Sequence, residues 1–213
     1  MFMEKEREQV RKYGRRLIET DLTTGTGGNI SVYNREQELM AIKPTGMEYM
    51  KIKTEDIPIM DLDGNKIEGS KSPSSEYEMH RIFYRKREGI GAVVHTHSIY
   101  STTISCLNRE IPPVHYLVAF SGEKVPCAEY ATFGTEELAE EAYEAMKDKY
   151  NATLLANHGL LAVGKDIASA FATAEEIEFC AELYYRTLTA GEPVLLSQED
   201  METVSKKFET YGQ

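Results

Sequence analysis

Two short apolar runs that each lead into histidine constrain the fold of this chain more than any other feature. The run AVV at 92–94 precedes His95 and His97, and the run ATLLA at 152–156 precedes His158. Short apolar runs of this kind are typical of strands buried in the core of a sheet. Because side chains alternate along a strand, His95 and His97 are expected to lie on the same face. The sequence therefore predicts a sheet whose buried strands end in imidazoles.

Helical and strand-like patterns alternate along the rest of the chain. Helices are predicted for residues 4–21, after the SPSSE segment at 72–76, and over 99–107, 135–150, 166–189 and 198–208. Strands are predicted at 30–33 and 38–43, and the Asp63-Gly64 pair predicts a hairpin. No internal repeat or change of composition marks a second domain. We therefore expect a mixed α/β fold with one domain over residues 1–213.

The composition disfavours two classes of partner. The 213 residues carry a net charge of −11, and 41% of them are hydrophobic. An acidic surface repels nucleic acid and anionic membranes, and no apolar segment reaches the ~18–20 residues needed to cross a bilayer. The three cysteines form no CxxC pair, which is typical of a reducing compartment. We expect a cytoplasmic protein that binds neither nucleic acid nor membranes.

The three histidines at strand ends form a candidate metal site. Three imidazole nitrogens with one position left open are typical of a catalytic divalent cation, most often zinc. His95 and His97 also fit polar residues where a strand meets its loop, and His158 alone also fits a hydrogen-bonded core histidine. The presence of the pattern in both segments favours the metal site.

Glu76 is the candidate acidic partner of these histidines. It lies at the start of the helix that precedes the His95 strand, so it can face the end of that strand. A carboxylate is also favoured there by the helix dipole, and a simple cap is the alternative. His80 lies four residues on and can share the same helix face, although the charge pattern of the helix explains it without a ligand role. His115 fits a polar residue beside a turn.

Three motifs rich in Gly, Ser and Thr form a candidate anion site. They are GTGGN at 25–29, KPTG at 43–46 and SPSSE at 72–76. Each alone is typical of a turn. Together they offer hydroxyls and backbone N–H groups, including those at a helix start, which bind phosphate well. An otherwise acidic protein can hold a phosphorylated small molecule with such groups.

Eight motifs of this chain resemble, in their order, those of the class II, zinc-dependent sugar-phosphate aldolases. They are GTGGN, PTG, PSSE, VVHTH, IPPVHY, VPCAEYATFGT, LLANHG and KFETYG, and the similarity runs from about Val10 to Tyr211. The resemblance is strongest to members that cleave L-fuculose 1-phosphate. It implies an α/β domain with a central, mainly antiparallel sheet flanked by helices. It also implies a homotetramer with active sites at subunit interfaces.

The resemblance implies a role for each motif residue. Zinc, one ion per subunit and replaceable by Co²⁺ or Mn²⁺, would be held by His95, His97 and His158 with Glu76 beside it. Glu76 and Tyr116 would be catalytic, Tyr116 acting on the aldehyde oxygen in the site of a neighbouring subunit. The phosphate would lie on Thr26, Gly28, Asn29, Thr45, Gly46, Ser74 and Ser75. Phe133 and Tyr211 would close the aldehyde end.

The activity implied is the reversible, metal-dependent retro-aldol cleavage of L-fuculose 1-phosphate to dihydroxyacetone phosphate and L-lactaldehyde, through a zinc-stabilised enediolate. L-Ribulose-5-phosphate 4-epimerase, or another sugar-phosphate aldolase or dehydratase on the same scaffold, is the alternative. The epimerases carry Asp in the PSS motif, whereas this chain has Glu76. A catalytically silent module is disfavoured because the three histidines and Glu76 are all present.

Overall fold

One eight-stranded sheet forms the centre of the molecule, in a computed structural model that describes residues 1–208. The strand order is β4-β3-β2-β1-β5-β8-β7-β6, and neighbours are antiparallel except β6 and β7. The strands are β1 (Asn29–Asn34), β2 (Leu39–Ile42), β3 (Ile59–Asp61), β4 (Lys66–Glu68), β5 (Ala92–Thr96), β6 (Cys127–Ala128), β7 (Ala152–Leu155) and β8 (Gly159–Gly164). The predicted mainly antiparallel sheet is confirmed.

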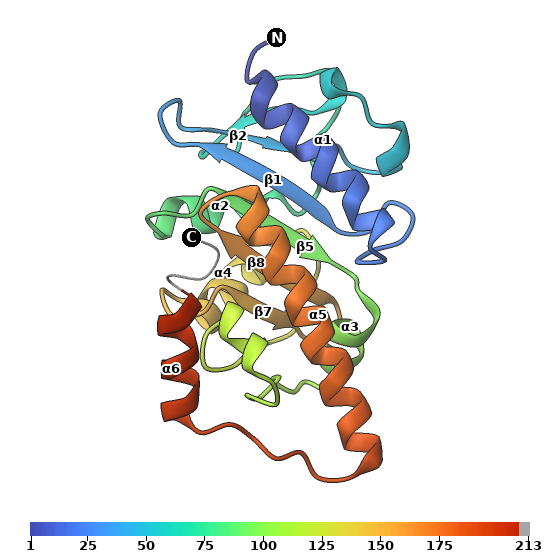
Figure 1. Ribbon diagram of the computed structural model, residues 1–213. Coiled ribbons are helices and arrows are strands. Elements are labelled where there is room, and N and C mark those ends of the chain that lie inside the picture. The colour runs from blue at the N-terminus through green and yellow to red at the C-terminus, as the bar shows by residue number, and fades with distance from the viewer. Residues whose placement is uncertain (209–213) are drawn as a thin grey trace.

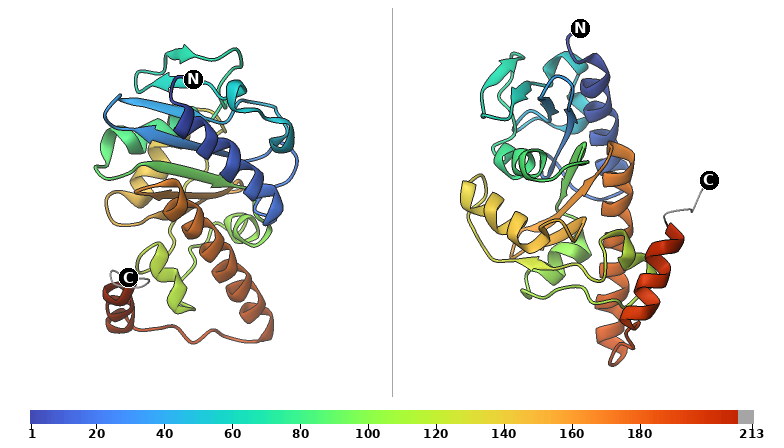
Figure 2. Two further views of the ribbon diagram at one scale, coloured as in Figure 1. Left: turned by 45° about the horizontal axis from the view of Figure 1, so that its top comes forward. Right: turned by 90° about the vertical axis from the view of Figure 1, so that its left-hand side faces the viewer.

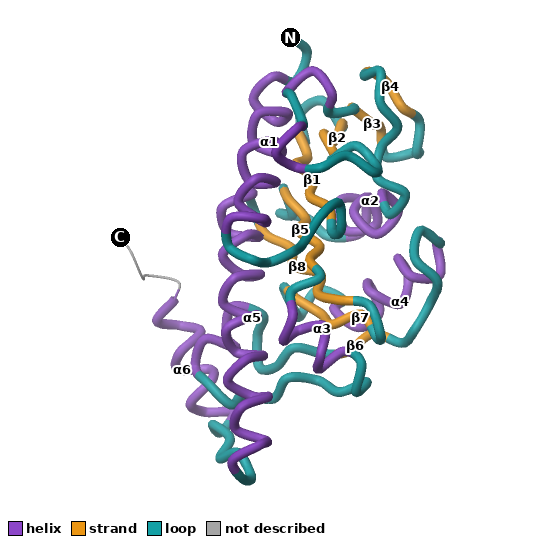
Figure 3. The backbone as a smooth tube through the Cα atoms, turned by 90° about the vertical axis from the view of Figure 1, so that its right-hand side faces the viewer, coloured by secondary structure: helices purple, strands orange, loops and turns teal. Residues whose placement is uncertain are grey.

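Helices cover both faces of this sheet. They are α1 (Glu4–Glu19), α2 (Tyr77–Lys86), α3 (Ile99–Ser105), α4 (Glu136–Met146), α5 (Ile167–Ala190) and α6 (Gln198–Phe208), with short 3-10 helices at Tyr49–Lys51, Thr54–Asp56 and Tyr116–Phe120. Helices α1 and α5 lie on one face, and α2 and α4 lie on the other (Figures 1 and 3). The predicted mixed α/β fold is confirmed, as is the hairpin at Asp63-Gly64.

Alternate side chains of β5 pack into two separate hydrophobic cores. Val94 packs in the cluster that contains the buried residues of α1 and α5. Val93 packs in the other cluster, with the buried residues of α2 and α4. The same alternation puts His95 on the α2 side and Thr96 on the α5 side. The sheet thus presents its first histidine to the helix that begins beside Glu76.

Local signals explain where the longer helices begin. Thr135 accepts a hydrogen bond from the Leu138 N–H at 3.2 Å and caps α4, at the start of the helix predicted over 135–150. Asp166 and Ser169 form a capping box at the start of α5. Helix α6 follows an extended segment after α5 and stands beside the 3-10 helix Tyr116–Phe120 (Figure 2). None of the described helices combines the length and the apolar character that crossing a bilayer requires.

Candidate active site

The central strands bring three histidines together. His95 is in β5, His97 lies just beyond it, and His158 lies in the turn between β7 and β8. Strands β5 and β8 are antiparallel neighbours, so the end of β5 meets the beginning of β8. The ligand atoms of the three rings lie within 4.8 Å of one another, and the Nε2 atoms of His95 and His97 are 3.0 Å apart. The cluster predicted from two distant segments is therefore present.

The protonation of these rings suits a divalent cation. His95 Nδ1–H donates to the carbonyl oxygen of Leu160 at 2.9 Å, so its Nε2 lone pair faces the other rings. Burial lowers the pKa of His95 well below its usual value, and it also lowers the pKa of His97 and of His158. Neutral imidazoles are the form that binds metal. Ligands about 2.0–2.1 Å from a tetrahedral zinc lie roughly 3.3 Å apart, which is close to the 3.0 Å between the Nε2 atoms of His95 and His97.

Glu76 occupies the N-cap position of α2, but its carboxylate makes no capping hydrogen bond and points at the histidines. Its Oε1 lies 3.3 Å from His158 Nε2, and its Oε2 lies 3.6 Å from His95 Nε2. Oε2 accepts a hydrogen bond from Asn29 Nδ2 at 2.7 Å. Oε1 is buried and makes no hydrogen bond to any residue in the described range. A buried carboxylate oxygen without a partner costs about 1–3 kcal/mol, so this atom is arranged to meet a cation or a substrate.

The turn that carries His158 depends on the residues on either side of it, Asn157 and Gly159. Asn157 has φ 55° and itself adopts the left-handed conformation of the turn. Gly159 is required for another reason: a Cβ there would lie 2.3 Å from the carbonyl oxygen of Thr96. The missing side chain lets β8 approach β5 closely, and this approach brings His158 to His95.

Glu178 on α5 holds the segment that follows His97. Its carboxylate accepts from the Ser98 hydroxyl at 2.7 Å and from the N–H groups of Tyr100 and Ser101 at 2.7 and 2.8 Å. These donors lie at the start of α3, where N–H groups lack partners within the helix. The residue after the second histidine is thereby fixed to the long helix.

The three anion motifs are also assembled. Thr45 N–H donates to the carbonyl of Ser72 at 3.0 Å, and Ser74 N–H donates to that of Lys43 at 2.9 Å. Tyr49 OH donates to the carbonyl of Gly27 at 3.2 Å, which ties in the glycine-rich loop. Three of the predicted phosphate ligands are buried, namely Gly28, Asn29 and Ser74. The other four are exposed, namely Thr26, Thr45, Gly46 and Ser75. The side-chain amide of Asn29 faces Glu76 and His80.

Lys43 is a residue whose position the sequence prediction missed. It is 2% exposed, and its ammonium donates to the carbonyl of Thr26 at 3.0 Å and lies 4.7 Å from the ring centre of Tyr49. Burial lowers the pKa of Lys43 to about 8, and the charge of Glu76 partly opposes this shift. A cation thus lies among the three anion motifs, in which Glu76 is the other charged side chain. The Lys in KPTG was the available signal.

A cavity of about 290 Å³ opens beside the histidines. Its lining consists of Glu76, His97, Tyr130, Ala131, Phe133, Asn157 and His158. Phe133 therefore lies in the same cavity as the histidines, together with Tyr130 and Asn157. Tyr211 falls outside the described residues. Tyr116 does not line the cavity; its ring lies 6.3 Å from that of Phe208 and is 46% exposed.

The two remaining histidines lie apart from the cluster. His80 is completely buried, so the interpretation of it as part of the charge pattern of a solvated helix is wrong. His80 is buried because its face of α2 packs on the polar side chains of Asn29 and Ser31 in β1. His115 precedes a 3-10 helix, and its Nδ1 accepts from the Leu117 N–H at 3.3 Å, as expected for a residue beside a turn.

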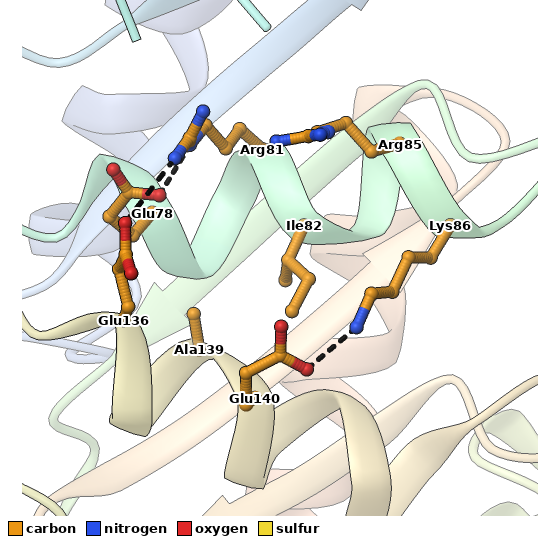
Figure 4. Close-up of a pocket in the computed structure, with 8 residues that line it drawn as sticks. All are labelled: Glu78, Arg81, Ile82, Arg85, Lys86, Glu136, Ala139 and Glu140. Atoms are coloured by element: carbon orange, nitrogen blue, oxygen red, sulfur yellow. Dashed lines mark hydrogen bonds and ion pairs between the residues drawn. The ribbon is translucent and has the colours of Figure 1, made fainter. Parts of the chain in front are cut away.

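A second hollow, of about 400 Å³, lies between α2 and α4 (Figure 4). Its charged groups pair with one another: Arg81 binds Glu78, and Lys86 Nζ binds Glu140 Oε2 at 2.6 Å across the two helices. The Lys86–Glu140 pair is exposed, and exposed pairs contribute only about 0–1 kcal/mol each. This groove joins two helices and shares no lining residue with the histidine cavity.

Comparison with known proteins identifies the family of this chain. The family model described as Class II Aldolase and Adducin N-terminal domain matches residues 8–185. A 5-deoxy-D-ribulose 1-phosphate aldolase from Bacillus thuringiensis is 56% identical over 213 residues, 100% of each chain. The L-fuculose phosphate aldolase of Escherichia coli K12 is 43% identical over 210 residues, 94% of this chain and 96% of that one. A solved L-fuculose 1-phosphate aldolase shares 47% identity and a TM-score of 0.94, with 96% of each chain covered. The resemblance seen in the eight motifs is confirmed: the chain belongs to the class II aldolase family.

Proposed function

We propose that this chain cleaves a ketose 1-phosphate between C3 and C4, releasing dihydroxyacetone phosphate and a short aldehyde. The observation that carries the proposal is the free, buried Oε1 of Glu76, which lies among neutral imidazoles. The anion loops stand beside this group and suit the phosphate. A base, a cation site and a phosphate site in one place are what a retro-aldol reaction needs.

His95, His97 and His158 would hold the divalent cation, which we propose to be zinc because three nitrogen ligands and an open position suit it. When bound, the cation supplies a Lewis acid for the negative charge that develops on the ketose oxygens. The sequence-based proposal of one ion per subunit is retained, and so is that of a homotetramer with shared sites.

Glu76 would transfer the proton to and from C3 of the substrate. When the C3–C4 bond breaks, its electron pair stays with C3, and Glu76 then delivers a proton to C3 to give dihydroxyacetone phosphate. In the synthetic direction Glu76 removes the same proton. Tyr116 of a neighbouring subunit would exchange a proton with the aldehyde oxygen, because Tyr116 does not line the cavity of its own subunit.

We propose 5-deoxy-D-ribulose 1-phosphate as the preferred substrate. The relative of that name matches the whole chain at 56% identity, and Tyr130, Ala131 and Phe133 give the cavity an apolar wall that suits the methyl group of acetaldehyde. L-Fuculose 1-phosphate, the substrate expected from the sequence, is the second candidate. It is favoured by the relative at 43% identity and by the solved structure at a TM-score of 0.94.

Purified metal-loaded protein should cleave 5-deoxy-D-ribulose 1-phosphate with a kcat/KM about 10-fold above that for L-fuculose 1-phosphate, since apolar pockets discriminate weakly between such aldehydes. Release of dihydroxyacetone phosphate measures both reactions. The reverse ranking would restore L-fuculose 1-phosphate as the substrate. Conversion of L-ribulose 5-phosphate to D-xylulose 5-phosphate, without cleavage of either ketose, would replace the aldolase proposal by the epimerase.

Lys43 should supply charge to the phosphate site. We expect Lys43→Met to raise KM at least ~10-fold, as for the loss of one hydrogen bond to a charged group. The kcat/KM of the unaltered protein should fall as the pH rises through about 8, because the Lys43 ammonium then loses its proton. This alkaline loss should be absent from the variant.

The matched control is Lys51→Met, which removes an exposed lysine paired with Glu48. It should leave KM and the pH profile unchanged. A Lys43→Met protein with the KM and the alkaline limb of the unaltered chain would contradict the assignment.

A further inference from the structure

We propose that His80 is a positioning residue, which sets the direction of a buried hydrogen-bond chain and thereby orients Glu76. The chain runs from Tyr84 through Ser31 and His80 to Asn29, and ends on Glu76. His80 itself touches neither substrate nor cation. This inference rests on the proposed function of Glu76 as the proton carrier and deepens it.

Every link of the chain is a direct contact. Tyr84 OH lies 2.5 Å from Ser31 Oγ, which lies 2.7 Å from His80 Nδ1. His80 Nε2 contacts Asn29 Oδ1, and Asn29 Nδ2 donates to Glu76 Oε2 at 2.7 Å. All five residues are buried. This hydrogen-bond chain is therefore shielded from solvent over its whole length, from the core under α2 to the carboxylate of Glu76.

The spacing of the residues explains why they meet. Glu76, His80 and Tyr84 are four residues apart, so they share one face of α2. Asn29 and Ser31 are two residues apart and share one face of β1. In the ladder between β1 and β5, Asn29 lies opposite His95. The polar face of β1 is thus covered by α2 and ends at the first histidine.

The direction of donation along this hydrogen-bond chain follows from the group at its end, the Glu76 carboxylate. An ionised carboxylate can only accept, so Asn29 must present its NH₂ group to Glu76 and its Oδ1 to His80. His80 must then donate from Nε2, which leaves Nδ1 of the neutral ring as an acceptor. The Ser31 hydroxyl donates to Nδ1 and accepts from Tyr84 OH. Complete burial lowers the pKa of His80 to about 3, so the ring has a single N–H to place.

This arrangement leaves the two carboxylate oxygens of Glu76 with different tasks. Oε2 is held by Asn29, whereas Oε1 makes no hydrogen bond within residues 1–208. A proton carrier must be held within about 0.5 Å of its productive position by the groups behind it. If His80 did not donate, the amide of Asn29 would be free to turn its oxygen toward the carboxylate and would repel it.

Two variants of His80 separate positioning from simple packing. His80→Gln keeps an N–H that can reach Asn29 and an oxygen that can accept, whereas His80→Leu removes both donor and acceptor at a similar volume. We expect His80→Leu to slow proton exchange at C3 of dihydroxyacetone phosphate at least ~10-fold, at nearly unchanged KM. His80→Gln should stay within about 3-fold of the unaltered protein. Tyr84→Phe removes only the far end and should have little effect on exchange.

Equal exchange rates for His80→Leu and His80→Gln would overturn the inference. So would a loss of rate that merely follows a loss of metal content or of melting temperature. Histidine ¹⁵N NMR of the metal-free protein gives an independent test, because His80 should show its proton on Nε2; a proton on Nδ1 would also overturn it. Absence of exchange in the unaltered, metal-loaded protein would instead contradict the proposed function.

Discussion

Exhaustive removal of divalent cations should lower aldol cleavage by at least about 1000-fold, because a Lewis acid supplies several kcal/mol of charge stabilisation. The groups of the histidine cluster offer no positive charge to balance this negative charge. The three imidazole rings are neutral, and Glu76 is a carboxylate. Addition of Zn²⁺ should restore the rate, and Co²⁺ or Mn²⁺ should restore it in part. Full activity in protein shown to be free of metal would end the proposal of a metal site.

Two controls make this result specific. His97→Ala should reduce both bound metal and activity, whereas His115→Ala, which removes a histidine outside the cluster, should leave the bound metal unchanged. Borohydride added with substrate should not inactivate the protein. This second control is informative because Lys43 is buried near the site with its pKa lowered to about 8, which is the state of a lysine able to form a Schiff base.

Replacement of Glu76 by Gln should slow the exchange of the C3 proton of dihydroxyacetone phosphate at least ~100-fold, within the usual range for a general acid–base group. Gln keeps the size of the side chain and cannot carry the proton. Exchange of labelled dihydroxyacetone phosphate measures this step without the aldehyde. Metal content should be determined in parallel, since Glu76 also lies 3.3 Å from His158 Nε2.

The matched control is Glu78→Gln, two residues further along the chain, where the half-buried carboxylate binds Arg81. Its exchange rate should remain that of the unaltered protein. If Glu76→Gln exchanged the proton at the unaltered rate with its metal in place, another group would have to be the base.

Local patterns were sufficient to predict the elements and the meeting of the histidines. The apolar runs before His95 and His158 mark central strands, and neighbouring strands bring their ends together. The cap of α4 at Thr135 follows from one residue and its place before a periodic run. These features depend on spacing of a few residues, which the sequence displays directly.

The contacts between β1 and α2 could not be predicted in the same way. His80 has the same spacing from Glu76 whether it faces solvent or the sheet, and only the packing of α2 on Ser31 decides between them. The burial of Lys43 likewise depends on the glycine-rich loop, which lies far away in sequence. Such residues are fixed by tertiary contacts, whereas periodicity reports only secondary structure.

The register of the central sheet also determines when during biosynthesis the three-histidine cluster can be completed. Asn29 pairs with His95 on one side of β5, and Leu161 pairs with His95 on the other. A slip of one residue would turn His95 to the opposite face. The complete cluster therefore requires that strands distant in sequence have aligned correctly, and it cannot form until His158 has left the ribosome. Because contacts this far apart in sequence form slowly, we expect the site to be completed late in folding.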